Sequence, residues 1–389
     1  MERTAHNLGL DVVRSGAILA VLFSHTAPWF LGEGRLTEIR SAYIGMAGVE
    51  VFFSLSGFLI GGILLRAMDG GLGWAVLWRF WTRRWMRTLP AYWVLVFGLS
   101  FWFGVWDWRT PLFMQNFVPR TAWTPLTPHT WSLTLEEWFY VAVPILLAVT
   151  VAALRRVRWA PPLVCGALIL GCTAARSVAG LDPSPFWGPD PSINPVLRLD
   201  CAAWGVLAAW LVRRWQAPAG LAAVFAALGL GLLVLYGFIW VGLFEPARLM
   251  PWGFALWGRA WGPAQPALIE SAAALLLVGL HRVLPRNPWA WTAPFAWAAS
   301  VIAGLSYALY LVHVPVLWLL RDAGLDDQAG LAPRLVIVAV MLGTAWLLRY
   351  GVERPVLALR DRWAPERRGA VIAPSGGTSA GLRRSPRGF

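Results

Sequence analysis

The chain is dominated by long apolar runs that are separated by short polar connections. Stretches of about eighteen or more apolar residues recur along its length, and about twenty such residues cross the hydrocarbon core of a bilayer. The pattern predicts an all-α, polytopic membrane protein with about ten transmembrane helices around a polar central passage. The predicted spans cover residues 10–30, 44–65, 90–106, 138–154, 161–179, 196–212, 219–243, 267–284, 298–320 and 331–350.

Composition favours one membrane domain over several soluble ones. Of the 389 residues, 58% are hydrophobic and 14% are charged, a balance typical of integral membrane proteins. We assign residues 1–360 to a single integral-membrane domain. Residues 361–389 are rich in Gly, Ser, Pro and Arg, which predicts a disordered cytoplasmic tail that touches anionic lipid.

The distribution of charge predicts an orientation. All 33 basic residues are arginines, and they are scattered between apolar spans rather than gathered on one face. This pattern argues against a nucleic-acid partner and leaves the lipid bilayer as the surroundings. With a cytoplasmic N-terminus, the even-numbered connections carry most of the arginines, as the positive-inside rule requires. We therefore expect both termini in the cytoplasm.

The first span carries two ionisable residues, Arg14 and His25. Eleven residues turn a helix through three turns plus about 20° and rise about 16 Å, so both side chains share one face. Taken singly, Arg14 could snorkel to the interface and His25 could hydrogen-bond a neighbouring helix. Charged groups within a span are costly, however, and usually functional.

The second span, GVEVFFSLSGFLIGG over residues 48–62, enters from the opposite side and places Glu50 at the depth of His25. Ser56 follows, among small residues that also allow close helix packing. The three cysteines, Cys165, Cys172 and Cys201, lack metal-like spacing. They are interpreted as small apolar residues, and no metal site is expected.

A basic segment, WRFWTRRWMRTLPAYW over residues 78–93, precedes the third span. Its arginines Arg83, Arg84 and Arg87 lie within about one helical turn of one another. They either mark the cytoplasmic side or form a phosphate site facing the cytoplasm, because guanidinium groups bind phosphate oxygens in pairs.

The fourth span begins in HTWSLTLEEWFYVAVP, residues 129–144. Ser132 is placed like an N-cap, and the adjacent carboxylates Glu136 and Glu137 suit a helix start. They also lie near the depth of His25, where a carboxylate raises the basicity of an imidazole. A positional role is expected for His129.

Two later segments carry weaker signals. His313 lies within LSYALYLVHVPVLWLL, residues 305–320, where it would support the site or simply pack the helix. Arg198 and Asp200 are expected to pair near the outer end of the sixth span.

These blocks, in this order, resemble the membrane-bound acyltransferase-3 family of bacterial O-acyltransferases. LDVVRSGAILAVLFSH is similar to the opening helix of the family, and GVEVFFSLSGFLI, RRWMRTLPAYW and WSLTLEEWFY are similar to its next three signatures. RLDCAAWG, LSYALYLVHVPV and GVERPV fit weaker ones, so the resemblance extends to about residue 358. Trp138 stands where the family often has Gln, and Ser15-Gly16 replace bulkier residues.

The resemblance implies an acyl-CoA donor, with acetyl-CoA preferred, that is bound from the cytoplasm as a co-substrate; no permanently bound cofactor is expected. Arg14, Arg83, Arg84 and Arg87 would hold the donor, and His25 would be the general base. Glu136 is the favoured orienting carboxylate for His25; the alternates are Glu50 and Glu137 and the expected supporting residues are Ser56, Ser132 and His313. We favour direct attack by the acceptor hydroxyl over an acyl-enzyme.

The acceptor implied by the family is a carbohydrate of the cell envelope, and the location is the bacterial inner membrane. A glycosylated secondary metabolite is the alternative acceptor. The fused extracytoplasmic domain of some family members is not found in this sequence, so a separate protein is expected to deliver the acceptor. A transporter or lipid flippase without chemistry, and a catalytically inactive relative, are the competing interpretations.

Overall fold

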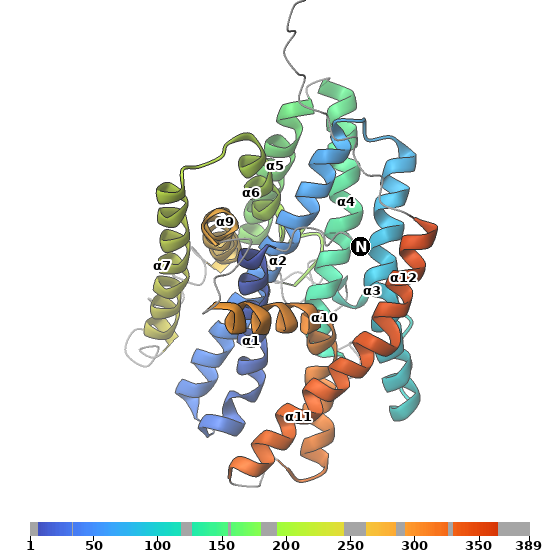
Figure 1. The fold of residues 1–389 in the computed structure, drawn as a ribbon, viewed down its shortest axis with the longest axis vertical. Helices are drawn as coiled ribbons and strands as arrows, with labels where there is room; N and C mark the ends of the chain where they lie inside the picture. Colours follow the sequence, from blue (N-terminus) through green and yellow to red (C-terminus); the bar gives the residue numbers. More distant parts are fainter. Residues whose placement is uncertain are drawn as a thin grey trace, which may run out of the picture.

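The computed structural model describes residues 7–32, 34–117, 127–154, 157–179, 193–244, 262–284, 292–325 and 330–364, and within these ranges the regular elements are all helices. Figure 1 shows them as one bundle. The longer helices are α1 Leu8–Leu31, α2 Arg35–Met68, α3 Trp74–Phe103, α4 Trp131–Leu154, α5 Ala160–Ala179, α6 Ala203–Arg214, α7 Ala219–Phe244, α9 Gln265–Val283, α10 Ala293–Asp322, α11 Leu331–Leu348 and α12 Arg354–Trp363. Short 3₁₀ turns cover Gln115–Phe117, Pro128–Thr130, Val157–Trp159 and Gly262–Ala264, and a π-helical turn, Arg349–Glu353, joins α11 to α12.

Each of the ten predicted spans corresponds to a helix, and the protein is an all-α, multi-pass membrane protein. Eight helical segments among the described residues are long and apolar enough to cross a membrane. The other two predicted spans fall on α3 and α6. Helix α3 has 30 residues, but arginines occupy its first half. Helix α6 has only 12 residues, about 18 Å, which is shorter than the roughly 30 Å hydrocarbon core.

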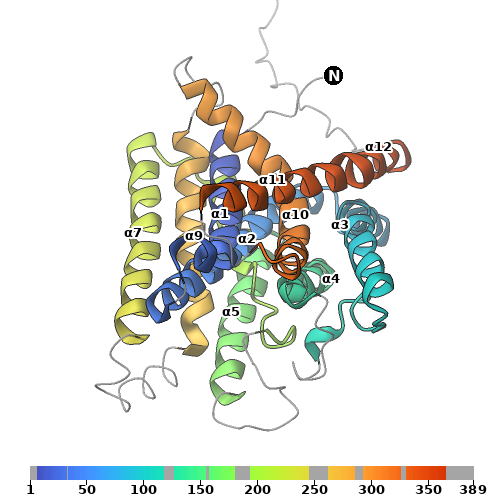
Figure 2. The ribbon, with the colours of Figure 1, turned by 90° about the horizontal axis from the view of Figure 1, so that it is seen from below.

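Helix α1 lies within the bundle and packs on α2, α9 and α10 (Figure 2). Helix α7 lies beside α9 at one edge, while α12 packs on α3 at the other (Figure 1). Two glycines allow α2 and α6 to approach closely. A Cβ atom added at Gly57 would overlap the carbonyl oxygen of Ala202, and one added at Gly205 would overlap that of Ser54. The backbones therefore meet without intervening side chains, as in other small-residue membrane interfaces.

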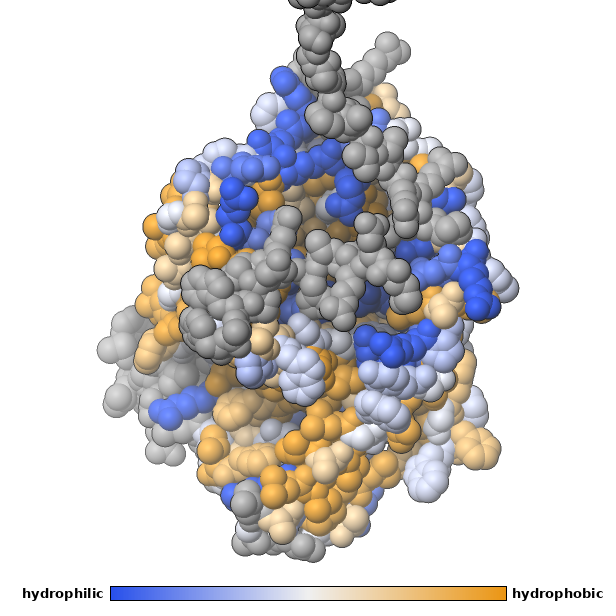
Figure 3. Space-filling model, viewed as in Figure 1, coloured by the Kyte–Doolittle hydropathy of each residue, from blue (hydrophilic) through white to orange (hydrophobic). Residues whose placement is uncertain are grey.

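Contacts between helix ends place the basic connections on one face of the bundle. Asp69, after α2, pairs with Arg213 at the end of α6. The Asn7 amide before α1 lies 2.8 Å from the imidazole of His281 at the end of α9. The Trp210 indole of α6 donates to the carbonyl of Arg158 before α5. On the face shown in Figure 3, hydrophilic residues gather in the upper half and apolar ones below.

The predicted tail begins at residue 361, but α12 continues to Trp363. Asp361 accepts a hydrogen bond from Arg83 at 3.4 Å, which fixes α12 against α3. Residues 365–389 lie outside the described residues.

Candidate active site

The first polar cluster is built where α3 meets α4. The Arg84 Nη2 atom lies 2.9 Å from the Glu136 carboxylate, and the guanidinium carbon lies 4.1 Å over the ring of Tyr140. Glu136 and Tyr140 are four residues apart, so successive turns of α4 present both to the same arginine. The Tyr140 hydroxyl donates to Glu136 as well. The side chains of Arg84 and Glu136 remain 19% and 14% exposed, so the pair is accessible.

Two further arginines add positive charge to this cluster. The charge of Arg14, on α1, interacts with those of Arg84 and Glu136. The charge of Arg87 interacts with those of Arg84 and Arg14, and also with that of Glu353 from the π-helical turn. Arg87 itself is exposed. The cluster therefore carries three guanidinium groups from two helices, a composition that suits a multiply charged anion such as a phosphate.

The remaining members of the first cluster are uncharged or buried. Ser56 on α2 lies beside the Tyr140 hydroxyl. Glu137 is buried beside Arg84 and Thr88. Its Oε2 atom is buried without a partner among the described residues.

The second cluster is made of three imidazole rings. His25 on α1 and His313 on α10 have ring centroids 5.0 Å apart, and the ring centroid of His129 also lies 5.0 Å from that of His313. His129 and His313 are buried, whereas His25 is exposed. His25 is therefore the member of this cluster with exposed surface in the described structure.

Tyr310 and Ser132 border the imidazoles. The Tyr310 hydroxyl donates to the carbonyl of His129, and the Ser132 hydroxyl is hydrogen-bonded to the Tyr310 hydroxyl. Ser132 and Glu136 are four residues apart on α4, which corresponds to a rise of about 6 Å. Helix α4 therefore connects the two clusters through one turn. On α1, Arg14 belongs to the first cluster and His25 to the second, in keeping with their predicted common face.

The structure places several predicted site residues differently from expectation. Glu136 pairs with Arg84 and Tyr140, so the contacts of this carboxylate do not include His25. Arg83 points away from Arg84 and donates to Asp361 and to the carbonyl of Ala364. The reason is that adjacent side chains diverge by about 100° around a helix.

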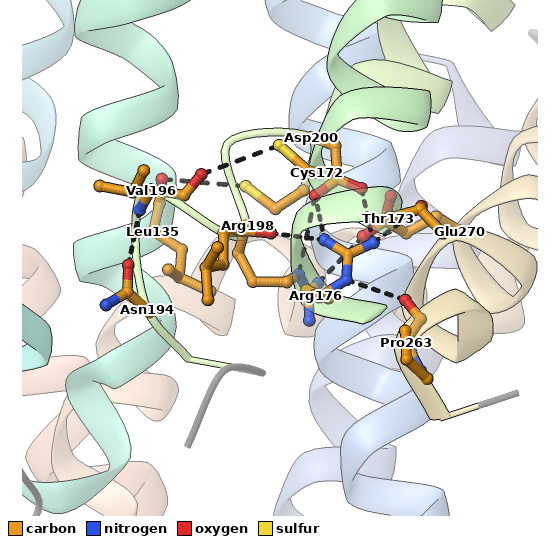
Figure 4. Close-up of polar contacts among 12 residues, drawn as sticks. Leu135, Cys172, Thr173, Arg176, Asn194, Val196, Arg198, Asp200, Pro263 and Glu270 are labelled. Carbon is orange, nitrogen blue, oxygen red and sulfur yellow. Dashed lines mark hydrogen bonds and ion pairs between the residues drawn. The ribbon is translucent and has the colours of Figure 1, made fainter. Parts of the chain in front are cut away.

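Glu50 belongs to a third polar cluster, with Arg198 and Glu270, which we call the Arg198 cluster. The Arg198 Nη2 atom lies 2.8 Å from Glu50 and 3.0 Å from Glu270 on α9, and all three side chains are almost fully buried. Asp200, the expected partner of Arg198, lies 4.0 Å from its Nε atom but makes a bidentate pair with Arg176 of α5 at 2.8 and 2.9 Å. Figure 4 shows Arg176 held between Asp200 and the carbonyl of Pro263. This cluster holds the irregular segment 193–202 between helices.

Sequence reasoning assigned His129 no role at the site, yet the structure brings its ring against His313. One signal for a role at the site was present in the sequence. His129 lies three residues before Ser132, at the end of the fourth span, and this end was expected to lie near the depth of His25. The pairing itself depends on contacts between residues 184 positions apart in the chain (313 − 129 = 184), which no local pattern encodes.

Arginines, carboxylates and imidazoles gathered between membrane-spanning helices define a multi-pass membrane protein with an internal polar site. The chain belongs to the acyltransferase-3 family, because the family model, described as an acyltransferase domain, matches residues 7–350.

Curated relatives are also similar to this chain. The peptidoglycan O-acetyltransferase OatA of Listeria monocytogenes is 24% identical over 376 residues, which are 89% of this chain and 55% of that protein. YrhL of Bacillus subtilis, provisionally named a peptidoglycan O-acetyltransferase, is 30% identical over 206 residues, 47% of this chain and 29% of YrhL. A provisionally named O-acetyltransferase of Staphylococcus aureus strain COL is 30% identical over 169 residues, 38% of this chain and 26% of that protein. The chain thus spans about half, or less, of the length of each of these relatives. No solved structure matches it.

Proposed function

We propose that this protein is a membrane O-acyltransferase that moves an acetyl group from acetyl-CoA to a hydroxyl group of a carbohydrate. The observation that carries the proposal is the spacing of two clusters: the arginines around Arg84 and the imidazoles around His25 are connected by one turn of α4. Membership in the acyltransferase-3 family supports the reaction type. Similarity to O-acetyltransferases supports acetyl as the group transferred.

The donor is proposed to enter on the face that carries the basic connections. Arg14, Arg84 and Arg87 bind its phosphates, because guanidinium groups make charge-assisted hydrogen bonds to phosphate oxygens. The thioester then extends along the face of α1 that Arg14 shares with His25. Arg83 is left out of this binding site, because Asp361 and Ala364 already engage it.

The transfer step uses His25 as the general base. His25 takes the proton from the acceptor hydroxyl while the oxygen attacks the thioester carbonyl carbon. The new ester C–O bond forms, the C–S bond breaks, and the departing thiolate receives the proton from His25 to give free CoA. His25 is suited to this step because its ring is exposed while the neighbouring imidazoles are buried.

The acceptor is proposed to be a polysaccharide of the cell envelope, with a glycosylated small molecule as the alternative. The relatives named as peptidoglycan O-acetyltransferases favour the polysaccharide. The basic connections would face the cytoplasm of a bacterial cell, which places both termini inside and the end of α1 near the outer surface. A separate protein would present the acceptor there.

Replacement of His25 tests the mechanism. We expect His25→Ala to keep its melting temperature in detergent but to lose about 10²–10⁴-fold in the rate of CoA release from acetyl-CoA, the usual contribution of a general base. The acceptor probe is an N-acetylglucosamine oligomer, and thiol release is the readout. The control is His281→Gln, which changes a histidine at the far end of α9. Wild-type turnover by His25→Ala would rule out this role.

The same assay separates the proposed enzyme from a transporter. A transporter or flippase with these buried polar groups would release no CoA with any acceptor. Wild-type protein that binds acetyl-CoA but never frees thiol, with oligosaccharide or small glycoside acceptors, would therefore favour transport.

A further inference from the structure

The tautomer of His313 is fixed by its own helix. Its Nδ1 atom lies 2.7 Å from the carbonyl oxygen of Tyr310, and a carbonyl oxygen only accepts hydrogen bonds. The neutral ring therefore carries its hydrogen on Nδ1, which leaves Nε2 as a lone-pair acceptor. That Nε2 atom is buried without a partner among the described residues.

The tautomer of His129 is fixed by the same turn of α10. Its Nε2 atom lies 3.1 Å from the carbonyl oxygen of Leu311. In a regular helix this carbonyl would accept from the amide of residue 315, but Pro315 has no N–H group to donate. Pro315 thus leaves the carbonyl of Leu311 available to His129. The Nδ1 atom of His129 becomes a second buried acceptor with no partner in the described part of the chain.

Two buried acceptors without donors require an explanation, because each costs about 1–3 kcal/mol when it stays unpaired. The imidazole of His25 is a neighbouring ring that can donate a hydrogen bond, and its centroid lies 5.0 Å from that of His313. The carboxylate that we expected to orient His25, Glu136, is already engaged by Arg84 and Tyr140.

We propose that His313 is the positioning residue for His25: its Nε2 atom accepts a hydrogen bond from His25, both in the free protein in solution and during the reaction, and His129 offers the next acceptor in the same cluster. This inference rests on the proposed function, because it assigns the group that orients the general base. The three rings form a histidine relay, with tautomers fixed by the carbonyls of Tyr310 and Leu311.

The relay conserves atoms and charge through the transfer step. One nitrogen of His25 donates a hydrogen bond to the Nε2 atom of His313. The other nitrogen of His25 therefore carries the lone pair that removes the proton from the acceptor hydroxyl. The resulting imidazolium of His25 keeps its hydrogen bond to the lone pair of His313. The proton then passes from His25 to the departing thiolate, and each ring returns to its starting tautomer.

Ring-¹⁵N nuclear magnetic resonance of the full chain in detergent tests the tautomers directly. The sequence has five histidines, so single substitutions assign every ring signal. We expect the hydrogen on Nδ1 of His313, on Nε2 of His129, and on one nitrogen of His25. His313→Leu should convert the His25 signals to an average of two tautomers, while His281→Gln leaves them unchanged. Unaltered His25 signals in His313→Leu would overturn the proposal, whatever the activity of the protein.

Kinetics supply the second readout. With acetyl-CoA and an N-acetylglucosamine oligomer, His313→Leu should lower kcat about 10²-fold, within the range of general base catalysis, and keep the KM for acetyl-CoA. His313→Gln, whose amide oxygen is also an acceptor, should recover most of that loss. Equal losses in the Leu and Gln variants would indicate a packing role and contradict the relay. If the wild type released no thiol, that result would count against the proposed function alone. The resonance experiment would still decide whether His313 orients the ring of His25.

Discussion

Neighbouring arginines in this protein have different roles because a helix turns them toward different partners. Arg84 contacts Glu136 and Tyr140 on α4, whereas Arg83 contacts α12. A sequence pattern treats the two as one basic group. The structure separates an arginine that belongs to the polar site from one that docks the end of the chain.

This separation predicts unequal effects of removing the arginines. Arg84→Gln should raise the KM for acetyl-CoA about 10–100-fold, because a hydrogen bond to a charged group contributes about 1.5–3 kcal/mol. Steady-state kinetics of thiol release would measure it. Arg79→Gln, on the same helix and without a recorded ion pair within the described residues, is the control and should keep its KM. Equal KM changes in both variants would indicate a general effect of charge.

Sequence reasoning at this scale found the ionisable residues but not their partners. Arg14, His25, Glu50 and Glu136 stand out because charged groups within apolar spans are costly. Their pairing depends on which helices pack together. Arg84 and Glu136 are 52 residues apart, and Glu50 and Arg198 are 148 apart, so periodicity within one helix cannot connect them.

Among the contacts between helices, the contact between α2 and α6 leaves very little room for added side-chain atoms. Gly57 of α2 meets the carbonyl of Ala202, just before α6, and Gly205 of α6 meets the carbonyl of Ser54. We expect Gly57→Ala to lower stability by about 1–3 kcal/mol, the usual cost of overpacking. Thermal denaturation in detergent would report it as a lower melting temperature. Gly171→Ala on α5, where an added Cβ meets nothing within 4 Å, is the matched control. Unchanged melting of Gly57→Ala would mean that α6 moves aside freely.

Hydropathy located the helices but placed the start of α6 seven residues too early. The predicted span 196–212 includes residues that form turns before α6 begins at Ala203. These residues, VLRLDCA, are apolar enough to pass for part of a span, although the Asn-Pro pair just before them is a turn signal. The polar groups of Asp200, Arg176 and Arg198 support this buried irregular backbone, a condition that non-helical segments at membrane depth must satisfy.

For the whole molecule, the Arg198 cluster joins distant parts of the chain. It links α2, α5, α9 and the segment before α6 through hydrogen bonds and ion pairs that are almost fully buried. Breaking a buried pair is costly because the partner charges stay behind.

We therefore predict that Arg198→Met lowers stability by about 3–5 kcal/mol, seen as loss of folded protein during purification and a lower melting temperature. Glu270→Gln keeps an acceptor for Arg198 and removes one carboxylate, so its effect should be smaller. If Glu270→Gln were the more damaging of the two, the ion pair between Arg198 and Glu50 would not be the main support of the cluster.

The late start of α6, at Ala203, has an electrostatic consequence for this cluster. Arg176 and Arg198 face Glu50, Asp200 and Glu270, so two formal positive charges meet three negative ones. Helix α6 begins three residues after Asp200 without a side-chain cap, and a helix start carries about half a positive charge. The backbone of α6 thus acts as a counter-ion inside the bilayer. A longer helix, starting earlier in the chain, would move that charge away from Asp200.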